Sequence, residues 1–218
     1  MTITLIPGRT AAATLGALAA AYGLTSRLVL APADDDLLAR VATPGLLEDW
    51  PLHRCSETVR GLSSLHRYLL DGETPQQLAR DYQTLFVTTP SCVPAPFESA
   101  YRPFEDLLFE LPTFDVRDER HVFGLQVTER TDHKGDHLGQ ELQYAGRLCL
   151  AAREAAERGD DAAVTAVLDA HHTFLEDHLM RWAPGCLRET EADAATSFYR
   201  GAAALALGVL AHAHERLR

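Results

Sequence analysis

The chain has 218 residues, and 46% of them are hydrophobic, which is enough to build one substantial core. The formal net charge of −11 argues against a nucleic-acid partner, because neutralising phosphates needs clustered basic side chains, and Lys134 is the only lysine. An acidic surface attracts a basic ligand or peptide instead, although acidity can also serve simply to keep a protein soluble. We expect a single domain over residues 1–218.

Cysteine usage and hydropathy bear on the compartment. Four widely separated cysteines, none in a C-x-x-C pair, indicate reduced thiols: Cys55, Cys92, Cys149 and Cys186. No run approaches the roughly eighteen apolar residues that span a bilayer. The stretch from Ala11 to Ala21 resembles a short signal-peptide core, but it is rich in Ala and Gly rather than Leu, and Tyr22-Gly-Leu-Thr follows like a helix end. We predict a cytoplasmic protein without stable membrane insertion.

The first half of the chain predicts helices near residues 10–23, 33–42 and 56–70. Thr74-Pro-Gln-Gln77 has the pattern of a capping box, with proline at the first helical position. Leu78, Tyr82 and Leu85 then form one apolar face, and the helix is expected to end near Val87, before a proline-rich connection.

The second half is also helical in pattern. A helix is expected near 118–129, and another begins at Asp136 and ends at Gly159. Asp160 is expected to cap a further helix that runs to about Trp182 and is ended by Pro184-Gly185. The last helix, from about Ala192, is apolar over a broad arc and should be deeply buried. The fold class predicted is all-α, a single-domain helical bundle.

Metal binding is one interpretation of the polar residues on these helices. His137 and Glu141 are four apart on one helix face, with His133 nearby and His171, His172 and His178 on the next helix. The usual Glu-x-x-His pairing is absent, however, and Asp136 as an N-cap with His137 on the first-turn surface explains the same residues.

His171 and His178 lie seven apart on an otherwise apolar stripe. They either line a polar cavity or are core histidines bonded to backbone carbonyls, and we favour the second interpretation. The sequence contains no G-x-S-x-G elbow and no glycine-rich phosphate loop. It therefore gives no positive case for an enzyme, and we predict no cofactor.

The middle segment combines aromatic rings with a carboxylate on a proline-rich connection, from Pro94 to Tyr101. Fixed aromatic rings beside a carboxylate suit a groove for a peptide that contains arginine. A loop whose aromatic rings fill the core explains the pattern equally well.

Five motifs in order carry a resemblance to a known family: Tyr82-x-x-Leu85-Phe86, Pro94-x-Pro96-Phe97-Glu98-Ser99-x-Tyr101, Asp136-His137-Leu-x-x-Glu141-Leu142, His178-Leu-x-x-Trp182-x-Pro184 and Phe198-Tyr199-x-x-Ala202. Together they resemble the TorD/DmsD/NarJ family of redox-enzyme maturation chaperones. The resemblance runs from about residue 75 to the C-terminus.

This resemblance implies an all-helical cytoplasmic chaperone, not an enzyme. Its partners would be the twin-arginine signal peptide and the apo catalytic subunit of a molybdenum oxidoreductase of the dimethyl sulfoxide reductase type. The chaperone would hold that subunit until the molybdopterin cofactor is inserted. The peptide-binding residues that it implies are Pro96, Phe97, Glu98, Ser99, Tyr101, Asp136, His137, Glu141 and Trp182.

One departure concerns His133, which stands where family members often have an acidic residue, three before the Asp136-His137 pair. It bears on the charge of the groove and hence on which client is bound. Two other functions remain open: a metal-dependent enzyme using His133, His137, Glu141 and His178, and a helical scaffold for a folded partner. A homodimer is possible, since the Ala-rich helix at 202–213 can exchange between copies.

Overall fold

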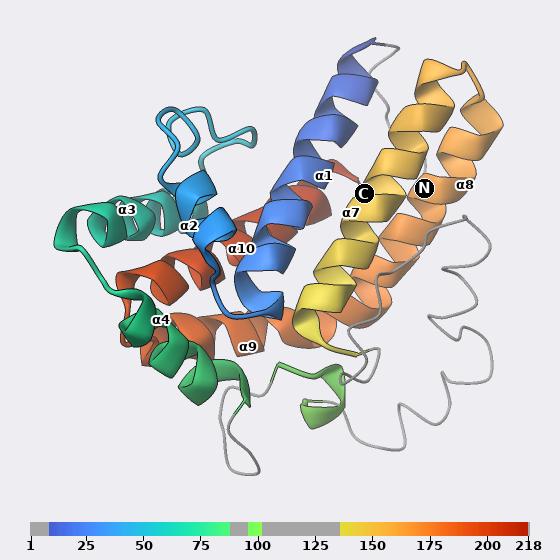
Figure 1. Cartoon of the computed structure of the whole chain (residues 1–218). Coiled ribbons are helices and arrows are strands. Elements are labelled where there is room, and N and C mark those ends of the chain that lie inside the picture. The colour runs from blue at the N-terminus through green and yellow to red at the C-terminus, as the bar shows by residue number, and fades with distance from the viewer. Residues whose placement is uncertain (1–8, 88–95, 102–135, 218) are drawn as a thin grey trace.

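The computed structural model describes residues 9–87, 96–101 and 136–217, and the regular structure of these residues is entirely helical (Figure 1). This confirms the predicted all-α class. The α-helices are α1 (Arg9–Leu30), α2 (Asp35–Val41), α3 (Ser56–Asp71), α4 (Pro75–Tyr82), α7 (Leu138–Glu157), α8 (Asp161–Phe174), α9 (Met180–Asp193) and α10 (Ser197–Arg216). Two π-helical turns, η1 (Gln83–Val87) and η3 (Leu175–Leu179), and the 3-10 turn η2 (Glu98–Ala100) complete the list.

The core is organised around α10, which packs against α1, α3, α4 and α9. Every residue from Gly201 to Leu210 is buried, as the broad apolar arc predicts. On the other side of α1, α7 runs alongside it and α8 runs alongside α7 (Figure 1). Helices from both halves of the described chain therefore surround the last helix.

Glycine allows α3 and α10 to approach closely. A Cβ atom on Gly61 would lie 2.7 Å from Leu205, and one on Gly201 would lie 2.8 Å from Leu65 and 3.0 Å from the Gly61 carbonyl oxygen. Neither site has room for a methyl group without displacing the facing helix.

The N-terminus of α10 is held by carboxylates from outside the helix. Asp81 of α4 is buried and accepts from the backbone N–H groups of Ala195 (3.1 Å) and Thr196 (2.8 Å). Glu73, before α4, accepts from the N–H of Ser197 at 2.5 Å. Carboxylates at a helix N-terminus satisfy free N–H groups and the helix dipole, so these contacts fix α4 against α10.

Several helix boundaries follow the predictions. Thr74 and Gln77 form the expected capping box, the helical run from Pro75 reaches Val87 through η1, and Gly159 follows α7 with a positive φ of 72°. Asp160 caps α8 as expected. The helix predicted at 118–129 lies outside the described residues.

Three boundaries were wrong. α1 continues through Gly23 to Leu30, because its second half is buried against neighbouring helices. Pro184 does not end the helix: α8, η3 and α9 form one run from Asp161 to Asp193, with buried Trp182, Ala183, Cys186 and Leu187 packing it in place. α10 begins at Ser197 rather than near Ala192, where α9 is still helical.

By length and composition alone, the stretch Ala11–Leu30 of α1 could cross a membrane, which the sequence analysis did not anticipate. Half of its most apolar window is buried inside the fold, against α7 and α10. In this structure α1 therefore has the packing of a core helix.

Candidate functional site

The segment 96–101 pairs with the beginning of α7. Phe97 and His137 form an isolated antiparallel bridge, in which the Glu98 N–H donates to the Asp136 carbonyl (3.0 Å) and the Leu138 N–H donates to the Pro96 carbonyl (2.8 Å). Figure 1 shows η2 directly beside the start of α7. Two motifs that lie about forty residues apart in the sequence thus meet at one place.

The first turn of α7 is capped by His137, not by Asp136. Nδ1 of His137 accepts from the Gly139 N–H at 3.0 Å, and the side chain is fully buried, with the Phe97 ring edge-on at 5.3 Å. The placement of His137 on the helix surface was therefore wrong. Asp136 is partly exposed, and its Oδ2 accepts from the Ser99 N–H at 3.2 Å.

Glu98 points inward. Its side chain is only 6% exposed, and Oε2 lies 3.2 Å from Nδ1 of His178, which forms an ion pair when the imidazole is protonated. His178 lies on η3 and stacks on the Phe174 ring, with centroids 5.3 Å apart. The π-helical turn thus presents His178 to the segment 96–101, in keeping with the frequent occurrence of such turns at functional sites.

A second buried contact joins α7 to α9. Nε1 of Trp182 donates to Oε2 of Glu141 at 3.1 Å, and both residues are at most 2% exposed. The Tyr101 ring lies 5.6 Å from the Trp182 ring, and its hydroxyl donates to Oε2 of Glu189 at 2.8 Å. Burial, above all, raises the pKa of Tyr101, so the phenol stays a donor.

The predicted site residues therefore fall into two groups. Pro96, Glu98, His137, Glu141 and Trp182 are buried, whereas Phe97, Ser99, Tyr101 and Asp136 are exposed or partly exposed. Sequence reasoning missed Glu189, which is seven residues after Trp182 on α9 and so near the same helix face. Because Pro184 was expected to end the helix, Trp182 and Glu189 were not placed on the same helix.

The residues of the metal hypothesis make other contacts. Among the residues that the structure describes, no three His, Cys, Asp or Glu side chains gather as a metal site, and His133 lies outside them. His137 caps α7 and His178 pairs with Glu98. Of the cysteines described, Cys55, Cys149 and Cys186 are thiols that form no disulfide, and Cys92 lies outside this part of the chain.

His171 differs from the satisfied core histidine that was predicted. It is fully buried beside the Tyr22 ring, with centroids 5.8 Å apart, and neither imidazole nitrogen has a hydrogen-bond partner in the part of the chain that the structure describes. Burial lowers the pKa of His171 to about 4, with a smaller contribution from His172. The imidazole is therefore neutral at pH 7.

Comparison with known proteins gives concordant matches. Residues 53–188 match the family model described as nitrate reductase delta subunit, a range that includes both motifs of the site. Chaperone protein TorD of Photobacterium profundum is 27% identical over 123 residues, which is 56% of each chain. Chaperone protein TorD of Vibrio cholerae is 25% identical over 171 residues, 78% of this chain and 75% of that protein. The chain thus spans little more than half of the Photobacterium protein.

Proposed function

Because this chain belongs to the TorD/DmsD/NarJ family of maturation chaperones, whose model is described as nitrate reductase delta subunit, we propose that it is a system-specific chaperone for a molybdenum oxidoreductase. It binds the twin-arginine signal peptide, or the N-terminal segment, of a catalytic subunit of the dimethyl sulfoxide reductase type. It holds that subunit in the cytoplasm until the molybdopterin cofactor is inserted. The protein acts by binding and not by catalysis.

The observation that carries the proposal is the exposed edge of the site, formed by Phe97, Ser99, Tyr101 and Asp136. Asp136 accepts from the Ser99 N–H through Oδ2, while Oδ1 is covered and has no hydrogen-bond partner among the described residues. An acceptor in this state is costly unless a donor reaches it. A client guanidinium that displaces the covering atoms supplies that donor, and the adjacent rings offer it a stacking surface.

The buried residues of the site have a supporting role in this proposal. Glu98 is engaged by His178, and Glu141 by Trp182, so neither carboxylate faces a peptide in this structure. Glu98 ties the segment 96–101 to η3, and Glu141 ties α7 to α9, so both contacts stabilise the elements that carry the Asp136 edge. Preorganisation of this kind raises affinity because less ordering is needed on binding.

Calorimetric titration with synthetic twin-arginine peptides from the molybdenum enzymes of the same organism tests the function. Each peptide is paired with a control in which both arginines are alanine. We expect micromolar or tighter binding of one peptide and loss of binding in its control. If a folded catalytic subunit bound equally well with and without its N-terminal segment, the protein would instead be a scaffold for a folded partner.

Asp136→Asn tests the site. The substitution keeps the shape and the Ser99 contact but removes the charge, so we expect at least a tenfold weaker Kd for the twin-arginine peptide, or about 1.4 kcal/mol. Asp71→Asn, at an exposed carboxylate near the end of α3, is the matched control and should bind normally. Unchanged affinity of a folded Asp136→Asn protein would remove Asp136 from the site.

A further inference from the structure

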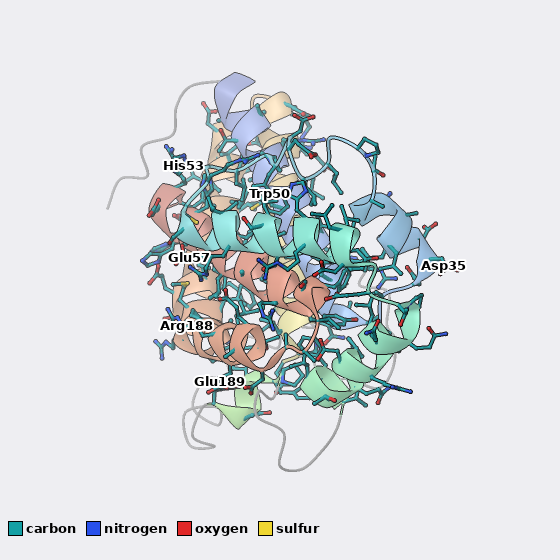
Figure 2. All side chains as sticks on the ribbon, turned by 90° about the vertical axis from the view of Figure 1, so that its left-hand side faces the viewer. Asp35, Trp50, His53, Glu57, Arg188 and Glu189 are labelled. Atoms are coloured by element: carbon teal, nitrogen blue, oxygen red, sulfur yellow. The ribbon has the colours of Figure 1, made fainter. Side chains whose placement is uncertain are left out.

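A cavity of about 1100 Å³ opens on the other side of α1, between the second half of that helix, α2 and the loop 43–51. Figure 2 labels Trp50, whose loop forms one wall. Apolar groups make up most of the lining, among them Ala20, Leu24, Leu37, Leu46, Trp50 and Pro51. The volume is slightly above the usual range for ligand sites, roughly 300–1,000 Å³, so the cavity can hold several apolar side chains.

The rim of the cavity is acidic. Three exposed aspartates line it, Asp34, Asp36 and Asp49, against two arginines, Arg27 and Arg40. Arg27 is engaged by Asp34 in an ion pair. An apolar interior with a net negative rim complements a segment that is apolar and is flanked by basic residues.

The cavity adjoins the candidate site through α1. The Ser26 hydroxyl donates to the Gly139 carbonyl at 2.7 Å, and a Cβ atom on Gly139 would lie 2.7 Å from the Cβ of Leu30. The end of α1 is thus pressed against the first turn of α7, which follows Asp136 and His137 (Figure 1). Arg27, on the cavity side, is the residue next to Ser26.

We propose that this cavity receives the apolar stretch of the client segment whose arginines contact Asp136. The inference rests on the proposed function and adds a second subsite to it. Ser26 contacts the first turn of α7 and the next residue, Arg27, lines the cavity, so one extended segment that passes around the end of α1 can reach both places. The buried Trp50 indole N–H has no acceptor within residues 9–87, 96–101 and 136–217, and after a small rotation a client carbonyl can accept from it.

Gly23 provides the test because it lines the cavity and a Cβ atom there meets nothing within 4 Å. Gly23→Leu projects a side chain into the cavity from a helical position that tolerates leucine better than glycine. Gly23→Ala, which fills little space, is the matched control. Both proteins are titrated with the twin-arginine peptide and with a version whose apolar stretch is replaced by serine and glutamine.

The expected result is a loss of at least tenfold in affinity for the twin-arginine peptide in Gly23→Leu, with Gly23→Ala close to the unchanged protein. The serine and glutamine peptide should bind weakly and equally to all three proteins. Arginine-dependent binding that is the same in Gly23→Leu and Gly23→Ala overturns the cavity subsite while leaving the function standing. Absence of arginine-dependent binding in every protein overturns the function itself. If Gly23→Leu changed the oligomeric state, measured by sedimentation, but left peptide binding intact, the cavity would be an interface with a second copy of the chain and not a peptide subsite.

Discussion

The buried imidazole of His171 makes the stability of the fold depend on pH. His171 has a pKa of about 4 in the folded protein, lowered mainly by burial, against 6.5 as its ordinary value. Between these values the unfolded chain binds a proton that the folded chain excludes, so stability is complete above pH 6.5 and falls as the pH is lowered towards 4. The loss is roughly 3 kcal/mol, from a difference of 2.5 pKa units at about 1.36 kcal/mol each.

His171→Phe should remove this part of the acid sensitivity. We expect its unfolding free energy to change less between pH 7 and pH 4 than that of the unchanged protein, as measured by urea denaturation at each pH. His66→Phe, at an exposed histidine, is the control and should keep the full dependence because His171 is still present. If the unfolding free energy changed equally with pH in all three proteins, protonation of His171 would not reduce the stability of the fold.

Substitution of Glu98 should lower the stability of the fold more than it lowers the affinity for the client peptide. Glu98→Gln leaves the buried amide facing His178 without an ion pair, and we expect destabilisation by about 1–3 kcal/mol in urea denaturation. The folded fraction should bind the twin-arginine peptide with an affinity near that of the unchanged protein. A folded Glu98→Gln protein that has lost peptide binding would place Glu98 in direct contact with the client.

At the scale of the helices, the contact between α3 and α10 depends on glycine. Gly201→Ala introduces a methyl group 2.8 Å from Leu65 and 3.0 Å from a backbone oxygen, so we expect a loss of about 1–3 kcal/mol. Gly185→Ala is also within a helix but meets nothing within 4 Å, and it should be neutral or stabilising by up to about 1 kcal/mol. Thermal unfolding of the two variants side by side measures the difference.

Helices were predictable where local chemistry determines them. The capping box at Thr74, the cap at Asp160 and the apolar arc of α10 are properties of neighbouring residues, and each appears as expected. Pro184 was misjudged because buried side chains from Trp182 to Leu187 hold α9 together despite the missing N–H. Tertiary packing of this kind cannot be predicted from the neighbouring residues in the sequence.

The sequence motifs predicted segments that meet in the fold, but not the orientation of their side chains; the membership of the binding site stays a prediction. Motif order in the sequence named residues that do meet, since 96–101 pairs with 136–138. It did not separate Asp136, at the exposed edge, from Glu98 and Glu141, which face buried partners. Whether a carboxylate faces inward depends on His178 and Trp182, which are distant in sequence.

For the whole molecule, the net charge of −11 predicts a salt dependence of client binding. A basic peptide is attracted by the acidic surface over distances that salt screens, about 10 Å at 0.1 M. We expect the affinity for the twin-arginine peptide to fall severalfold from low to physiological salt, mainly through slower association. Titration across a salt series checks this, and a flat response would show that the arginines are not recognised by charge.

Exchange of the Ala-rich helix between copies has a physical cost in this fold. α10 is buried by α1, α3, α4 and α9 of its own chain, so its release exposes most of the core. The possible homodimer stays a prediction, to be measured by sedimentation over a concentration series.

The wide turn η3 takes up one residue more than an ordinary α-helical turn without breaking the helix. The helices on its two sides, α8 and α9, therefore keep nearly the phase of one continuous α-helix. Deleting one residue from Leu175–Leu179 would convert the turn to ordinary α-helix and leave α9 in nearly the same orientation. Deleting one residue within α8 would instead rotate α9 by about 100° relative to the start of α8, because an α-helix advances by that angle per residue. Trp182 and Glu189 would then leave Glu141 and Tyr101, although no side chain that makes those contacts had been changed. Natural variation should therefore accept a single-residue deletion in η3 far more readily than one in α8.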